Sequence, residues 1–157
     1  MKQISIKLTL LSTALLIFAV QVPTVQAHDY IGAFGSVSGA GATDLLSVDC
    51  AFDINAGSQQ PTKKLAIALQ DGTAGGGIVS VEATTGSKAT TVTDNIGGDG
   101  LATNYKYLTL ATAVQDVSFT VLINHTASGV KNYVASLHCQ DATGQHTGTT
   151  ITVLQNQ

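Results

Sequence analysis

The feature that most constrains this chain is a period-two alternation of apolar and polar residues, which recurs between breaks rich in glycine or asparagine. Alternation of this kind places every second side chain on the same face of a strand. The clearest example runs from residue 45 to residue 54. Its apolar positions, which should all face a core, are Leu46, Val48, Cys50, Phe52 and Ile54. No stretch after residue 27 has convincing helical spacing, so the sequence predicts an all-β protein.

The same pattern predicts five further strands at residues 64–70, 78–83, 116–125, 131–141 and 149–154, and weaker ones at residues 30–37, 89–93 and 105–111. The residues expected to face inward on these strands are Leu65, Ile67, Leu69, Val117, Phe119, Val121, Ile123, Tyr133, Ala135, Leu137, Cys139, Ile151 and Val153. The dipeptide Asp71-Gly72 indicates a turn. Seven to nine short antiparallel strands with this spacing favour a two-sheet sandwich.

Residues 1–27 have the composition of a cleavable secretory signal. Lys2 and Lys7 precede an apolar run over residues 8–20, and the small residues Val25 and Ala27 indicate cleavage before His28. The run is shorter than the about 20 residues of a membrane-spanning helix, and no second run follows it. We therefore expect an exported protein with one domain, residues 28–157, that spans no membrane after cleavage. Its location would be the periplasm, the cell surface or the medium.

Residues 28–157 hold five lysines, ten acidic residues and no arginine, which gives a net charge of −5 with neutral histidines. Binding to nucleic acids or to anionic lipids requires a cluster of positive charge, and these lysines are scattered. We therefore exclude nucleic acids as partners, together with the surface of anionic membranes.

Cys50 and Cys139 are the only cysteines, and both fall on the apolar face of an expected strand. In an exported chain this pattern predicts a disulfide that crosses the core. A redox or thiolate metal site is disfavoured because neither cysteine has a second ligand nearby in the sequence.

One cysteine on an early strand and one on the penultimate strand resemble the inter-sheet disulfide of immunoglobulin-like domains. The resemblance covers most of residues 28–157 and implies a sandwich of seven to nine strands. The chain has no tryptophan to pack on the disulfide, and Leu137 stands where such domains place their corner tyrosine. The resemblance is therefore one of architecture only.

Cleavage before His28 would expose its α-amine beside its imidazole, and one more imidazole would complete a three-nitrogen set suited to copper. This arrangement resembles the N-terminal histidine site of copper monooxygenases and of some periplasmic copper carriers. The possible partners are His125, His138 and His146, and their spacing does not select one. The alternative is that His28 is merely the first residue after cleavage and that the other histidines are surface or strand-end residues.

The segment 94–100 offers oxygen ligands for calcium, namely Asp94, Asn95 and Asp99 on a glycine-rich loop. Its spacing matches no EF-hand, and an ordinary loop is the alternative. The chain has no Gly-x-Ser-x-Gly motif, and Glu82 is its only glutamate. We therefore expect no enzymatic activity and, by default, no cofactor.

Three functions follow from these observations. The first is a non-catalytic structural or adhesive subunit of a fibre, pilus-like assembly or surface layer, with itself or another surface protein as partner. Its glycine-rich segment 28–42 would add a strand to a neighbour through Tyr30, Phe34 and Val37, or would form an edge strand. The second is a periplasmic copper-binding protein that uses His28. The third is a secreted ligand-binding module, which the scarcity of aromatic residues disfavours.

Overall fold

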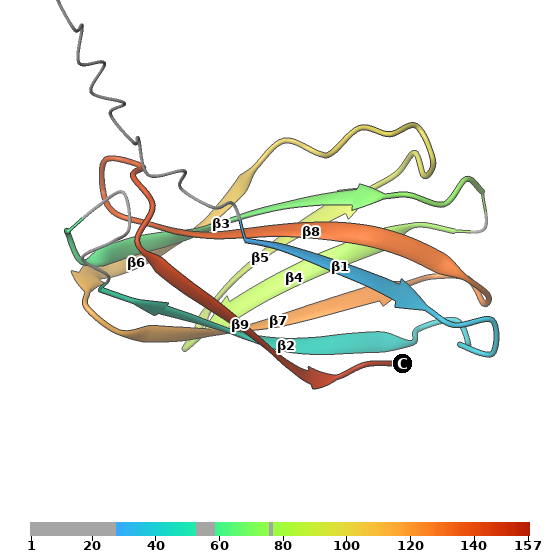
Figure 1. The fold of residues 1–157 in the computed structure, drawn as a ribbon, viewed down its shortest axis with the longest axis horizontal. Coiled ribbons are helices and arrows are strands. Elements are labelled where there is room, and N and C mark those ends of the chain that lie inside the picture. Colours follow the sequence, from blue (N-terminus) through green and yellow to red (C-terminus); the bar gives the residue numbers. More distant parts are fainter. Residues whose placement is uncertain (1–27, 53–58, 76) are drawn as a thin grey trace, which may run out of the picture.

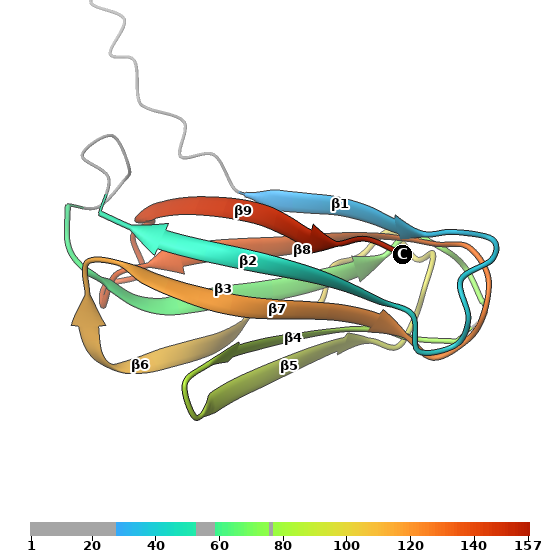
Figure 2. The same ribbon diagram turned by 90° about the horizontal axis from the view of Figure 1, so that it is seen from below.

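The computed structural model describes residues 28–52, 59–75 and 77–157, and these residues form nine antiparallel strands and no helix. The first sheet has the order β1 (Asp29–Phe34), β8 (Lys131–Gln140), β3 (Thr62–Asp71) and β6 (Lys106–Val114). The second has the order β5 (Lys88–Asp94), β4 (Val79–Thr85), β7 (Val117–His125), β2 (Thr43–Ala51) and β9 (Gly148–Gln155). The sheets are stacked as two layers of a sandwich (Figures 1 and 2). The predicted all-β sandwich is confirmed.

The core lies between the two sheets and consists of the residues that alternation placed inward. Fully buried members come from both layers: Leu65, Ile67, Leu69, Tyr133, Ala135 and Leu137 from one, and Leu46, Val48, Phe119, Val121 and Ile123 from the other. Burial of each large aliphatic or aromatic side chain contributes about 1.5 to 3 kcal/mol, so this set supplies the main stabilising term. Of the described residues, none belongs to a helix long and apolar enough to cross a membrane.

Two residues predicted to face the core are not buried. Phe52 is 45% exposed, because the pairing of β2 with β7 and β9 ends at Cys50 and Ala51, so Phe52 lies beyond the paired part of the strand. Val153 is 46% exposed, because β9 is an edge strand that pairs only with β2. Ile54 lies outside the described residues. Alternation identifies a face, but it does not show where the partner strands stop.

The disulfide prediction is confirmed. Cys50 on β2 and Cys139 on β8 are joined, their Cα atoms are 5.6 Å apart, and both are almost completely buried. Because β2 and β8 belong to different sheets, the bond links the two layers through the core.

The segment 28–42 forms an edge strand in its first half. All six residues of β1 pair with β8 of the same chain, from Asp29 opposite Ser136 to Phe34 opposite Lys131. Phe34 is completely buried, and Gly32 leaves the space that the Tyr133 ring occupies. A Cβ atom at Gly32 would lie 2.3 Å from the Tyr133 hydroxyl oxygen. Gly32, one of the glycines for which this segment was expected to pair with a neighbour, therefore contributes to the fit of β1 against β8.

Candidate functional site

Two histidines meet on the outer face of the first sheet. His138 lies between Leu137 and Cys139, which face the core, so its ring points outward from β8. His146 belongs to the turn between β8 and β9, and an isolated bridge to Gln140 brings it back beside His138. The two Nδ1 atoms are 3.4 Å apart, and the rings meet edge to face at 72°. We call His138 and His146 the histidine pair.

Tyr105 holds the ring of His138 from the other side. Its hydroxyl lies 3.2 Å from Nε2 of His138, and the two rings are nearly perpendicular at 82°. His138 therefore has one ring nitrogen engaged by Tyr105 and the other directed at His146. A contact of this kind fixes the orientation of an imidazole, as the outer partners of metal-bound histidines do.

His28 lies beside the histidine pair because of the β1–β8 pairing. Its carbonyl accepts a hydrogen bond from the Leu137 N–H at 3.0 Å. Burial lowers the pKa of His138 below its ordinary value, the positive charges of His146 and His28 lower it further, and Asp29 partly opposes them. Burial also lowers the pKa of His146, again with a contribution from His28. Both imidazoles of the pair are therefore neutral at pH 7, the form that binds metals.

The structure thus brings His28, His138 and His146 near one another, but their side chains do not form a complete set of metal ligands. Within the described part of the chain, no three or more His, Cys, Asp or Glu side chains are arranged so that they could hold a metal ion. The histidine pair supplies two facing nitrogens, and His28 lies within electrostatic range of both rings.

His125 is not part of this cluster. It ends β7, is buried, and stacks on Phe34 with ring centroids 4.3 Å apart. Phe34 pairs with Lys131 at the start of β8, whereas His138 lies near the end of that strand. Neither ring nitrogen of His125 makes a hydrogen bond. Burial lowers its pKa, and the nearby Gly39 carbonyl opposes this shift only in part. His125 is a packing residue, and a proton on its ring would be unfavourable.

Replacing His125 with leucine should reduce the loss of stability on acidification. In the parent protein the unfolded state binds protons more readily, so stability is full above the ordinary histidine pKa and falls as the pH drops toward the lowered native value. The leucine variant lacks this term and removes two buried nitrogens without partners, so it should be at least as stable at neutral pH. Urea unfolding at about pH 7.5 and about pH 5 measures both effects. An equal or steeper pH dependence in the variant would contradict this reading.

The residues proposed for calcium serve as turn caps in this structure. Asp94 accepts hydrogen bonds from the Asp71 and Ile96 N–H groups at 2.7 and 3.0 Å, and Asp99 accepts one from the Leu101 N–H at 2.9 Å. Together with Asn95 these residues line an open depression. The calcium site stays a prediction, and the local turns account for both carboxylates without it.

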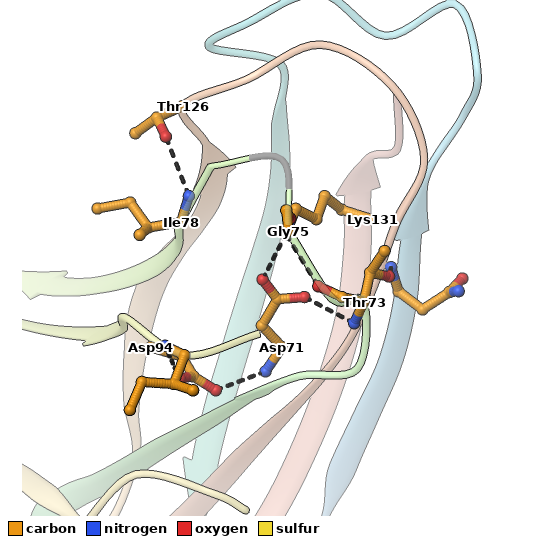
Figure 3. Close-up of polar contacts among 9 residues, drawn as sticks. Asp71, Thr73, Gly75, Ile78, Asp94, Thr126 and Lys131 are labelled. Carbon is orange, nitrogen blue, oxygen red and sulfur yellow. Dashed lines mark hydrogen bonds and ion pairs between the residues drawn. The ribbon is translucent and has the colours of Figure 1, made fainter. Parts of the chain in front are cut away.

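A buried ion pair was missed by the sequence reasoning. Asp71, the last residue of β3, contacts Lys131 at the start of β8, with 2.7 Å between carboxylate and ammonium. The ammonium also donates to the carbonyls of Thr73 and Gly75, and Asp71 accepts from the Thr73 N–H (Figure 3). The pair therefore anchors the β3–β4 connection to β8. Lys131 lies two residues before Tyr133 and therefore on the same, inward face of the strand. This position was the sequence signal that could have indicated a buried lysine.

The three residues proposed for assembly differ in how deeply they are buried. Phe34 is buried and Tyr30 is partly buried against the core, whereas Val37 in the following loop is 97% exposed. Two tyrosines, Tyr105 and Tyr107, are exposed and could contact a ligand.

No known protein family, curated protein or solved structure matches this chain. Its function must therefore be argued from its own residues.

Proposed function

We propose that this protein is an exported, non-catalytic structural subunit that self-associates by exchanging β1 between copies. The observation that carries this proposal is the fit between β1 and the edge of β8. Every residue of β1 pairs with β8, Phe34 fills a buried site, and Gly32 accommodates Tyr133. Because each copy of the chain has the same β8 edge, the same contacts can form within one copy or between two.

The connection between β1 and β2 suits such an exchange. Residues 35–42 contain three glycines and no proline, and Val37 in this loop is almost fully exposed. Since the contacts of β1 are identical in both arrangements, exchange depends mainly on the loop conformation and on the entropy of association. Reciprocal exchange gives a dimer, whereas exchange in one direction from copy to copy gives a fibre.

Export is supported by the leader-like residues 1–27 and by the disulfide, which fits an extracellular or periplasmic location. The scarcity of charged residues, at 11% of the chain, is compatible with a role in assemblies on the cell surface. We propose a second copy of this chain as the partner, and another surface protein is the alternative.

Cross-linking between two variants, each with one introduced cysteine besides the native disulfide, tests the exchange. Ile31 on β1 is 78% exposed and lies opposite Val134 of β8. A mixture of Ile31→Cys and Val134→Cys proteins should form a covalent heterodimer under mild oxidation, because an exchanged β1 brings the two introduced thiols together. The measurement is non-reducing electrophoresis, with the bond located by mass spectrometry. The matched control replaces Ile31→Cys with Val37→Cys, an exposed thiol in the loop that has no partner in the β1–β8 pairing.

The exchange would be refuted if the heterodimer formed no faster than in the control mixture. It would also be refuted if the double variant Ile31→Cys/Val134→Cys closed its bond only within one chain and still assembled as the parent does. Light scattering that shows a strict monomer up to high concentration would contradict self-association itself and favour a secreted ligand-binding module.

A further inference from the structure

We propose that the histidine pair and the N-terminal residue His28 bind one nitrogen-preferring divalent transition metal ion, Cu²⁺ or Zn²⁺, after residues 1–27 are removed. The site lies on the outer face of the first sheet, beside the start of β1, and uses nitrogens from three places in the chain. It goes beyond the proposed structural function and does not depend on strand exchange, because one chain contains all its ligands.

The spacing of the histidine pair suits a shared metal ion. Nitrogen ligands lie about 2.0 to 2.1 Å from Zn²⁺, so two nitrogens 3.4 Å apart subtend an angle of about 110° at the metal. This angle is close to the tetrahedral value that Zn²⁺ prefers. Cu²⁺ prefers a tetragonal arrangement, which His146 can approach because it lies in a turn and not within a strand.

The surroundings of His138 direct its Nδ1 atom at His146, where a metal ion would replace the proton shared between the two rings. If both Nδ1 atoms bind the metal, Nε2 of His138 carries the proton and donates it to the Tyr105 hydroxyl oxygen, which lies at 3.2 Å. Asp29 acts on the same imidazole as a negative charge, which offsets part of the charge of a bound cation. The Cys139 side chain is in the disulfide and is not available as a competing ligand.

His28 can supply the remaining nitrogens only when it is the first residue. Its carbonyl is bound to the Leu137 N–H, one residue before His138, so its backbone is already held beside the pair. In the precursor the nitrogen of His28 is an amide, which must lose its proton before it can bind a metal ion. After cleavage it becomes an α-amine that can bind the metal together with the imidazole of the same residue. The site is therefore completed by processing.

Metal titration of four proteins tests this inference, with Cu²⁺ and Zn²⁺ as separate probes in competition with a chelator of known affinity. The proteins are the chain that begins at His28, the same chain with the α-amine of His28 acetylated, and the variants His146→Gln and Gln145→Ala of the first. We expect one ion per chain and, for Cu²⁺, nitrogen hyperfine structure in the electron paramagnetic resonance spectrum. Acetylation of the α-amine and His146→Gln should each weaken binding about tenfold or more, whereas Gln145→Ala, in the same turn, should not change it.

Equal affinity of the acetylated chain would overturn the role of the N-terminus, and equal affinity of His146→Gln would overturn the role of the pair. Circular dichroism and the unfolding midpoint show whether His146→Gln is folded. Should it be unfolded, Tyr105→Phe serves in its place, because it removes the contact that orients His138 and should also weaken binding. Titration of the monomer keeps this test separate from strand exchange, which the cross-linking of Ile31→Cys with Val134→Cys measures alone.

Discussion

Removing the disulfide should lower the free energy of unfolding by about 4 to 5 kcal/mol, the largest effect expected of any change to this protein. The bond closes a loop of 89 residues and joins the two sheets. Without it the unfolded chain gains the conformational freedom of that loop, while the native core loses a direct link between β2 and β8. The double variant Cys50→Ala/Cys139→Ala, compared with the oxidised parent in chemical unfolding, measures this effect.

Two outcomes would contradict the structural role of the disulfide. One is a variant whose free energy of unfolding lies within about 1 kcal/mol of that of the parent, because the chain-entropy model predicts a much larger loss. The other is mass spectrometry that finds two free thiols in the protein recovered from the exporting cell. Denatured parent protein, alkylated before and after reduction, is the control for the thiol count.

Replacing Lys131 with methionine should lower the free energy of unfolding by about 3 to 5 kcal/mol. Lys131 is 2% exposed and Asp71 is fully buried, so methionine fills most of the volume but leaves a carboxylate without its counter-charge. The loop carbonyls of Thr73 and Gly75 lose their donor as well. The anchoring of the β3–β4 connection should therefore weaken together with the global stability.

The matched control for this prediction is Lys106→Met, a lysine exposed on β6, which should change stability by less than about 1 kcal/mol. The double variant Lys131→Met/Asp71→Asn should recover much of the loss, because it removes the uncompensated charge and keeps an oxygen that accepts from the Thr73 N–H. Chemical unfolding of the parent, Lys131→Met, Asp71→Asn and the double variant gives the coupling energy of the pair. A single variant as stable as the parent would show that the buried ion pair contributes nothing, and a double variant no better than the single would refute the charge argument.

The two proposals have a joint consequence, because His28 immediately precedes β1. When β1 exchanges between copies, His28 moves with it, and the histidine pair then receives its third residue from the neighbouring chain. A metal ion bound there would hold the exchanged strand in place. The same ligands meet within one closed chain, so added Zn²⁺ would slow the exchange of β1 in both forms and would not by itself favour either form.

Sequence alone determined the fold class, because burial on one face of a strand depends on local alternation, which can be read without knowing the partner strand. It also determined the disulfide, since two cysteines on inward faces allow one pairing only. Tertiary structure decided whatever depends on where distant strands meet. Pairing of β2 with its neighbours stops before Phe52, and Asp71 reaches Lys131 across 60 residues. Likewise His28 joins His138 only through the register of β1 on β8, because strand pairing brings together residues that no local pattern connects.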